Sequence, residues 1–519
     1  MIKTLLKLLC LFMLGAIFHV RPIYAAGSTL SVEQLYNHIK DDPLKLRVFL
    51  RDFPKGGDLN NHLVGAIYAE TWLKWAGEDG LCVSISKAKI LPSPCGVVTH
   101  NEQPAQNLGK DLSAWSHMVA ALSMRDFVPM VGDRSAHDHF FGTFTRFAAV
   151  EKHHQGDMLA KALQQAARDH VIYIEIAVSP ALSAMINIEG RPKLEKKSDL
   201  SAVHEKLLPV LGSLTKLAQQ DITEMEKQAH QKLHCGEKDE DPACQIEVRY
   251  LFQTSRNLPL ISILTQLEVG YFLTKNDSRF VGVTLSGYED DPEALDHYKL
   301  QMEMFHFLNG IYPAVNIVLP AGELTANLVS PENLTSHIRD AIDIAGAQRI
   351  GQAMDILHED DSSSLLEKLA DHNILVELNL TRNEKILNIR GNEHPFTIYR
   401  QSLVPVAFIS DNEGILRSDL TEQYSLAAKQ FRLNYGDLIK LSRVSLEYAF
   451  VPGKSLWVKH NLGHKVMSCN REIVSIKPSK KCASYLKQNQ KAALEWRLEL
   501  ALKDFAKDEI HKSILSKAH

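Results

Sequence analysis

The stretch Pro-Lys-Gly-Gly-Asp-Leu-Asn-Asn-His-Leu-Val-Gly, residues 54–65, contains the first of eight short runs that we interpret as β-strands. Most runs are rich in Val, Ile and Leu with little strict alternation, as expected of strands buried on both faces. The runs are Gly57–Leu63, Val171–Val178, Ile246–Gln253, Phe280–Ser286, Ala314–Leu319, Arg349–Ile356, Ile374–Leu380 and Val404–Ile409. Helical patterns separate many of them, for instance Asp291–Leu308, Pro331–Ala345 and Asp361–Asp371. This alternation predicts an α/β fold of the (β/α)8 TIM-barrel type.

The N-terminus has the pattern of a secretory signal peptide. Met1–Lys3 carries a positive charge, Thr4–Phe18 is almost wholly apolar, and small residues follow at Ala25 and Ala26. The apolar run is short for a membrane span of roughly 20 residues, which favours cleavage over an uncleaved anchor. We therefore expect residues 1–26 to be removed and the mature protein to be secreted or periplasmic.

Two helical extensions flank the predicted barrel, which we place at residues 56–452. An N-terminal extension covers residues 27–55, because Ser31–Phe53 has helical periodicity. A C-terminal extension covers residues 453–519 and includes an amphipathic helix, roughly Gln488–Phe505. Insertions in the barrel are expected at about 78–110 and 227–242.

Six cysteines remain in the mature chain once Cys10, which lies in the apolar leader, is set aside. They form three couples that are close in sequence and lie in polar stretches. An even number of cysteines in an exported chain predicts disulfides. The simplest connectivity is 82–95, 235–244 and 469–482. Free thiols fit the polar neighbours less well, and no couple has the Cys-x-x-Cys spacing of a metal site.

The composition is that of an ordinary globular protein, with 45% hydrophobic residues, 23% charged residues and a formal net charge of −4. There is no basic excess that would predict a nucleic-acid partner. No segment after the leader is apolar enough to predict a membrane-bound mature protein.

Five motifs follow the predicted strands, where barrel enzymes place their chemistry. They are Pro54–Gly65, Val281–Asp290, Val315–Leu324, Arg349–Ala353 and Pro405–Gly414. Together and in this order they resemble the adenosine deaminase family, and most closely its secreted growth-factor-type branch. Further likenesses are Asp138–Phe144, Asn383, His394–Pro395, Arg417–Leu420 and Ser445–Gly453. The resemblance covers nearly the whole mature chain.

The resemblance implies a zinc ion that lowers the pKa of a bound water to about 7. The family's four metal ligands fall on Asn60, His62, Pro320 and Asp411. Only His62 and Asp411 retain the ligand type, because a neutral amide oxygen is a poor zinc ligand and Pro320 has no donor. We therefore expect zinc to be absent or weakly bound.

The resemblance also assigns the remaining roles in catalysis and substrate binding. The glutamate that handles the proton falls on Glu323, and the water-orienting histidine falls on Gln352. The acid that contacts the purine falls on Asn412, and a backbone contact to the purine falls on Gly287. Asn412 keeps an N–H donor, and Glu323 would donate if it were protonated in a closed pocket. Arg382 replaces a small residue and is expected to fill the pocket or bind an anion.

We interpret the chain as a pseudoenzyme that retains part of a purine nucleoside pocket. One alternative is a working adenosine aminohydrolase with an atypical metal shell, which forms inosine and ammonia. Another is a non-catalytic regulatory partner. The resemblance points to a homodimer, or a heterodimer with a homologue, through Ser31–Phe53 and the cysteine-bearing insertions.

Structural roles compete with these assignments. His62 without its partner ligands is expected to be a hydrogen-bonded core histidine, and Asp411 to cap a helix or to pair with Arg349 or Arg382. The pair His137 and His139 and the doublet His153–His154 lie in a stretch that reads as helical, where i, i+2 side chains do not share a face. We expect surface or packing roles for them.

Overall fold

The computed structural model of the protein describes residues 31–96, 101–127, 135–186 and 192–518, so the predicted signal peptide lies outside the described residues. Its centre is an eight-stranded parallel sheet in the order β1-β5-β6-β7-β8-β9-β10-β11. A parallel bridge between Asn61 and Asp411 joins the first strand edge to the last. The sheet therefore closes into the predicted (β/α)8 barrel. The strands are β1 (Gly56–His62), β5 (Val171–Val178), β6 (Glu247–Ser255), β7 (Phe280–Ser286), β8 (Ile317–Ala321), β9 (Arg349–Gln352), β10 (Leu375–Leu378) and β11 (Val406–Phe408).

Every predicted run coincides with one strand, and the larger differences have local backbone causes. β8 begins at Ile317 rather than Ala314, because Ala314 has a φ of 62°. β9 ends at Gln352 rather than Ile356, because Gln352 and Ala353 have φ angles of 68° and 49°. Extended strands do not continue through such left-handed residues, so β9 stops where they occur.

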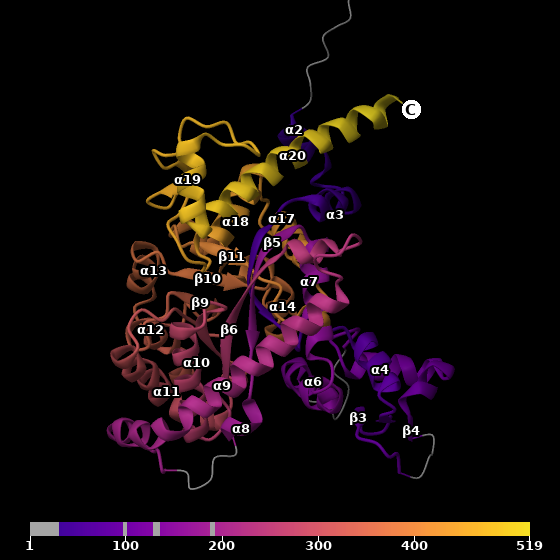
Figure 1. The fold of residues 1–519 in the computed structure, drawn as a ribbon, viewed down its shortest axis with the longest axis vertical. Coiled ribbons are helices and arrows are strands. Elements are labelled where there is room, and N and C mark those ends of the chain that lie inside the picture. Colours follow the sequence, from indigo (N-terminus) through magenta and orange to yellow (C-terminus); the bar gives the residue numbers. More distant parts are fainter. Residues whose placement is uncertain (1–30, 97–100, 128–134, 187–191, 519) are drawn as a thin grey trace, which may run out of the picture.

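Helices cover the outside of the barrel, as Figure 1 shows. They are α7 (Gln155–Arg168), α9 (Leu200–Lys232), α10 (Leu260–Asn276), α11 (Pro292–Ile311), α12 (His337–Asp343), α13 (Ser362–Asp371), α14 (Leu380–Leu387), α15 (Phe396–Gln401) and α17 (Leu420–Gln430). The predicted helix over 331–345 is a short 3-10 turn, Pro331–Leu334, followed by α12. All eight residues of β5 are buried, which explains the absence of alternation in its sequence.

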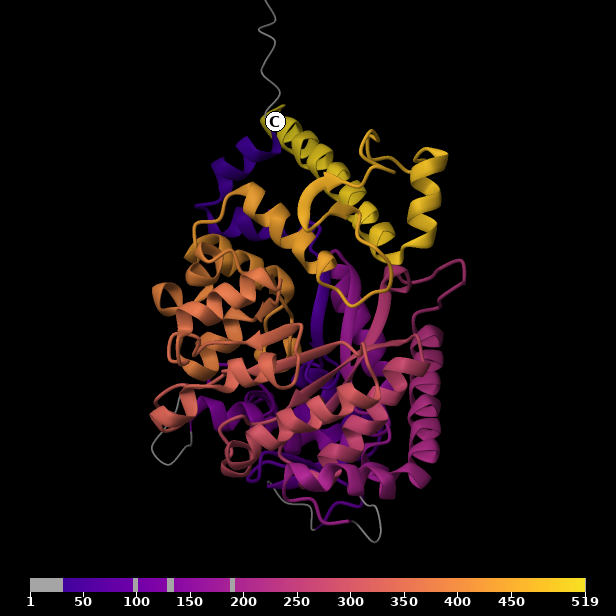
Figure 2. The same cartoon turned by 90° about the vertical axis from the view of Figure 1, so that its left-hand side faces the viewer.

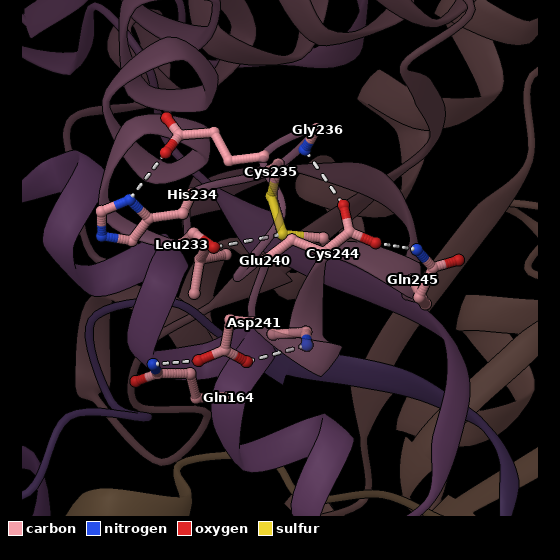
Figure 3. Close-up of a disulfide and its surroundings, with 11 residues drawn as sticks. Gln164, Leu233, His234, Cys235, Gly236, Glu240, Asp241, Cys244 and Gln245 are labelled. Carbon is pink, nitrogen blue, oxygen red and sulfur yellow. Dashed lines mark hydrogen bonds and ion pairs between the residues drawn. A yellow bond between two sulfur atoms is a disulfide. The ribbon is translucent and has the colours of Figure 1, made fainter.

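Three disulfides confirm the predicted connectivity: Cys82–Cys95, Cys235–Cys244 and Cys469–Cys482. The first belongs to a small antiparallel sheet of β2 (Cys82–Ser84), β3 (Lys89–Leu91) and β4 (Glu102–Pro104). The second ties the end of α9 to the turn before β6. In that turn the carboxylate of Glu240 accepts hydrogen bonds from the backbone of Gly236 and the side chain of Gln245 (Figure 3).

The two extensions pack together where the strands begin. The predicted N-terminal helix is two helices, α2 (Val32–Ile39) and α3 (Pro43–Asp52), because Pro43 starts a new helix that Asp42 caps. They lie against α18 (Tyr435–Glu447) and α20 (Gln490–Ala518). The ring of Phe505 on α20 lies 5.0 Å from Phe49 and 5.5 Å from Phe53. These ring contacts join the two extensions to each other.

The opposite end, where the strands finish, is covered by α6 (Ala136–Glu151). In Figures 1 and 2 the extensions and α6 lie at opposite ends of the molecule. Among the described helices, none combines the length and apolar character needed to span a bilayer.

Candidate functional site

A cavity of about 320 Å³ lies at the carboxyl ends of the barrel strands. It brings together all eight residues that the sequence analysis assigned to the site: Asn60, His62, Gly287, Pro320, Glu323, Gln352, Asp411 and Asn412. Its remaining wall is largely aromatic, from Phe140, Phe141 and Phe144 of α6 and from Tyr288. The cavity is therefore a single pocket, with polar residues from the strand ends on one side and aromatic residues from the covering helix α6 on the other.

Arg382 occupies the middle of this site. Its Nε and Nη2 both donate to the carboxylate of Glu323, with Nη2 2.6 Å from Oε2, and its Nη1 donates to Asp411 Oδ2 at 3.0 Å. The guanidinium also lies 4.7 Å from the ring of Phe140. Burial acts to lower the pKa of Arg382, but the charges of Asp411 and Glu323 outweigh it and raise that pKa above its ordinary value. One fixed cation thus neutralises much of the charge of the two acids.

The start of α14 explains how Arg382 reaches this position. Asn379 precedes the helix, and its Oδ1 accepts from the backbone N–H of Arg382 at 2.9 Å. The Nδ2 of Asn379 donates to the carbonyls of Ile409 and Ser410 after β11. This cap ties the first turn of α14 to the strand end that precedes Asp411, so the guanidinium is aimed across the barrel mouth.

His62 is held by two neighbours. Its Nδ1 lies 2.7 Å from Gln253 Oε1 and therefore carries the proton, while Nε2 lies 3.4 Å from Asp411 Oδ1. Burial lowers the pKa of His62, and the charge of Asp411 only partly opposes this effect. His62 is therefore held by hydrogen bonding as expected, but its side chain is 15% exposed and lines the cavity, so it is not a core residue.

Asn60 and Pro320 supply no metal-binding nitrogen. Asn60 Nδ2 donates to Glu377 Oε2 at 2.9 Å, and its Oδ1 has no hydrogen-bond partner among the described residues. The carbonyl of Pro320 accepts from Arg256 Nη2 at 2.6 Å. These contacts anchor both residues to the barrel wall.

The donor set of the cavity does not fit a zinc ion. Catalytic zinc needs three protein ligands of the His, Cys or carboxylate type, and only His62 and Asp411 remain at the family's ligand positions. The guanidinium of Arg382 already holds Asp411, and a second cation there would be repelled. Within the described chain, the one group of three such ligand atoms is His234, Glu237 and Asp239, and all three residues are exposed.

Gln352 ends a buried chain of hydrogen bonds. Its Oε1 accepts from Asn383 Nδ2 at 2.8 Å, and Asn383 Oδ1 lies 3.1 Å from His394 Nε2. The Nδ1 of His394 accepts from the backbone N–H of Phe396, so Nε2 carries the proton and donates to Asn383. Burial lowers the pKa of His394 from 6.5 to about 4. The chain of hydrogen bonds thus fixes the side-chain amide of Gln352 through its oxygen.

Asn412 and Gly287 take their places through close backbone packing. Asn412 Nδ2 donates to Asp411 Oδ1 at 2.8 Å, and a Cβ on Gly65 would lie 1.8 Å from Asn412 Oδ1. Gly287 has a φ of 105°, a conformation that favours glycine. Both glycines are therefore required by the shape of the pocket.

The sequence analysis missed two charged residues of the cavity wall, Arg256 and Glu289. Glu289 accepts from the backbone N–H groups of Gly322 and Glu323, each at 2.9 Å, and from His337. It shares its motif with Gly287, so its place after β7 was the available signal. Glu289 positions the loop that carries Glu323.

The structural roles expected of other residues are largely present. Asp411 pairs with Arg382 and not with Arg349, which lies between Glu175 and Glu377 inside the barrel. His137 lies 3.2 Å from Asp290, His139 contacts the carbonyl of Ser123, and His154 lies between Asp79 and Asp157 with its ring stacked on Trp75. These histidines have the predicted packing roles.

A (β/α)8 barrel with this constellation at its strand ends defines an amidohydrolase-type protein. The family model of adenosine deaminase matches residues 123–467, and the chain belongs to that family.

The chain is also similar to several individual proteins. An N6-methyl-AMP deaminase of Danio rerio is 29% identical over 215 residues, covering 40% of this chain and 56% of that protein. An adenosine deaminase of Plasmodium gallinaceum is 28% identical over 183 residues, covering 35% and 46%. The chain thus matches about half the length of these relatives. The solved N6-methyl-AMP deaminase of Arabidopsis thaliana has a TM-score of 0.49 at 18% identity, covering 78% of this chain and 94% of that one.

Proposed function

We propose that this member of the adenosine deaminase family binds a purine nucleoside at the barrel mouth and does not deaminate it. The observation that carries the proposal is Arg382, whose guanidinium pairs with both Glu323 and Asp411. The same two carboxylates are the ones that the family resemblance assigns to proton handling and metal binding.

We expect no turnover because the site lacks the groups that would generate the hydroxide nucleophile. Deamination needs a hydroxide, which zinc generates near neutral pH in this class of site. The donors at Asn60 and Pro320 do not hold zinc, and the charge of Arg382 opposes it. Gln352 stands at the position of the water-orienting histidine and has its oxygen committed to Asn383.

We expect nucleoside binding to be retained because of the size and the lining of the cavity. Small-molecule sites are concave, mostly apolar and carry a few fixed polar groups. The cavity of about 320 Å³ has an aromatic wall suited to a flat heterocycle. Asn412 and the backbone of Gly287 remain as polar contacts.

The role that we propose for Glu323 in ligand binding differs from the one expected from the sequence. Both of its oxygens accept from Arg382, so it meets a ligand as a hydrogen-bond acceptor and not as a protonated donor. The bound nucleoside would therefore offer an N–H or O–H to this side of the pocket.

We further propose that the protein is exported. Three disulfides suit an oxidising compartment, and the leader over residues 1–26 has the predicted signal-peptide pattern.

The test combines three measurements on the purified mature chain: elemental analysis, ammonia release from adenosine, and calorimetric titration with adenosine and inosine. We expect saturable nucleoside binding without stoichiometric zinc and without ammonia. Asn412→Leu should weaken the binding, whereas Asn470→Leu, a change of the same kind on an exposed loop, should not. Stoichiometric zinc with conversion of adenosine to inosine would instead establish an active aminohydrolase.

A further inference from the structure

A second surface of the molecule combines a high positive charge with exposed aliphatic side chains. It is formed by residues 465–487, which we call the basic loop. The basic loop contains five lysines and Arg471 but a single acid, Glu472, giving a net charge of +5 in a chain whose formal charge is −4. Neither the cavity nor the barrel chemistry involves this segment.

Three aliphatic side chains of the basic loop project into solvent. Met467, Ile473 and Ile476 are 79%, 81% and 87% exposed. The values of Ile473 and Ile476 are the highest of any large apolar side chain in the described chain. Single exposed apolar residues are common on soluble proteins, but here three lie within ten residues of one another.

The exposure is not a consequence of poor packing of the loop. The Cys469–Cys482 disulfide is fully buried and packs in a small apolar cluster with Trp457 and Trp496. Trp496 Nε1 also donates to the carbonyl of Ser475 at 3.0 Å. The backbone is thus held from the inside while the aliphatic side chains point outwards.

Exposed lysines follow these side chains in the sequence. Lys477, Lys480 and Lys481 are exposed, and no ion pair joins them to an acid in the described part of the chain. Their charges therefore face solvent without compensation, which attracts an anionic partner.

We propose that the basic loop docks the protein on an anionic lipid surface. Aliphatic side chains enter the headgroup–acyl boundary, and lysines are drawn to anionic headgroups within a Debye length. A nucleic acid or a sulfated glycan would satisfy the lysines but leave the three aliphatic side chains in water. A lipid surface satisfies both kinds of group, which is why the lipid is favoured.

The location of the loop fits such an attachment. The basic loop runs into α19 (Lys480–Gln488) and contains all of that helix except its last residue. This helix lies beside α20, at the end of the barrel opposite α6 (Figures 1 and 2). A protein docked through this end presents its cavity away from the lipid.

The test is flotation of the mature chain with vesicles of phosphatidylcholine, with or without phosphatidylglycerol. We expect binding to the phosphatidylglycerol vesicles, weakened by salt, and little binding to phosphatidylcholine alone. The Met467→Ser, Ile473→Ser, Ile476→Ser variant and the Lys477→Gln, Lys480→Gln, Lys481→Gln variant should each bind at least about tenfold more weakly. The single variant Ile476→Asp, at a side chain with almost no packing, should also lose binding while melting as the unmodified protein does.

A matched control removes three equally exposed aliphatic side chains elsewhere. Leu44, Leu112 and Leu403 are 80%, 79% and 79% exposed, and their joint replacement by serine should leave vesicle binding unchanged. The proposal is overturned if the protein ignores phosphatidylglycerol vesicles, or if the control loses as much binding as the loop variant. Retention on heparin resin without vesicle binding would identify the surface as a polyanion site and also overturn it.

Discussion

Arg382 and Glu323 are joined by two parallel N–H···O contacts across the barrel mouth, although 59 residues separate them in the chain. The remaining terminal nitrogen of Arg382 reaches Asp411. Bidentate pairing of this kind fixes both position and direction. The guanidinium therefore holds the carboxylates of Glu323 and Asp411 in fixed positions at the wall of the cavity.

Replacing Arg382 by methionine should destabilise the protein strongly. The change leaves Glu323 and Asp411 buried without their cation, and removing one partner of a buried pair costs about 3–5 kcal/mol. The free energy of unfolding in urea at neutral pH checks this. Adding Glu323→Gln and Asp411→Asn to the same chain should recover much of the loss.

The control for that experiment is Arg390→Met, just beyond α14. Arg390 pairs with Glu384 at 3.1 Å, but its side chain is 66% exposed. Exposed pairs contribute about 0–1 kcal/mol, so little change is expected. Similar losses in the two variants would show that the pairing of Arg382 does not stabilise the fold.

Restoring zinc should require removal of the arginine as well as return of the histidines. The variant Asn60→His, Pro320→His, Gln352→His supplies imidazoles but keeps a cation against Asp411. We expect it to bind zinc poorly, and we expect one zinc per chain only when Arg382→Ala is added. Elemental analysis after dialysis, with the zinc-dependent shift in melting temperature, measures this. Full zinc loading of the triple variant would contradict the role given to Arg382.

Acid should weaken the fold through His394. Because its pKa falls from 6.5 to about 4 on folding, the unfolded chain binds the proton first. The stability that neutral His394 provides is complete above pH 6.5 and is lost as the pH falls towards 4. The total is on the order of 3 kcal/mol. Stability measured by urea unfolding from pH 7 to pH 4 should show this slope.

The variant His394→Gln should flatten that part of the pH profile, since no titrating group remains at the end of the Gln352–Asn383 chain. His372→Gln, at an exposed histidine after α13, should leave the profile unchanged. An unchanged slope in His394→Gln would refute the assignment.

Gly65→Ala should disturb the site although it replaces none of the polar side chains that line the cavity. The added Cβ would meet Asn412 Oδ1 at 1.8 Å, which displaces Asn412 from Asp411. We expect a loss of about 1–3 kcal/mol in stability and weaker nucleoside binding in calorimetry. Gly212→Ala in α9 meets nothing within 4 Å and should instead stabilise by about 0.5–1 kcal/mol.

The barrel could be predicted because each strand is marked by a short apolar run that can be read from neighbouring residues alone. β5 and β7 were placed to the residue, since their apolar runs are bounded by clear turns. The start of β9 at Arg349 was also predicted, but its end was not, because the left-handed residues Gln352 and Ala353 have side chains that normally avoid that conformation. The break between α2 and α3 was visible as Asp42-Pro43 and was overlooked.

The positions of the site residues followed from ordered motifs, and Arg382 was one of the partners expected for Asp411, but its pairing with Glu323 was not expected. Pairing with Glu323 and Asp411 depends on how three strand ends meet in space, which no spacing along the chain records. The cap at Asn379 was the local clue, because an asparagine before Leu-Thr-Arg marks a helix start.

A positive charge that belongs to a side chain cannot be extracted by a chelator, diluted away or exchanged for another ion. The charge that Arg382 brings to the pocket therefore does not depend on the supply of trace metals in its surroundings. Ligand affinity should accordingly be indifferent to metal starvation, a condition that silences enzymes dependent on a dissociable ion.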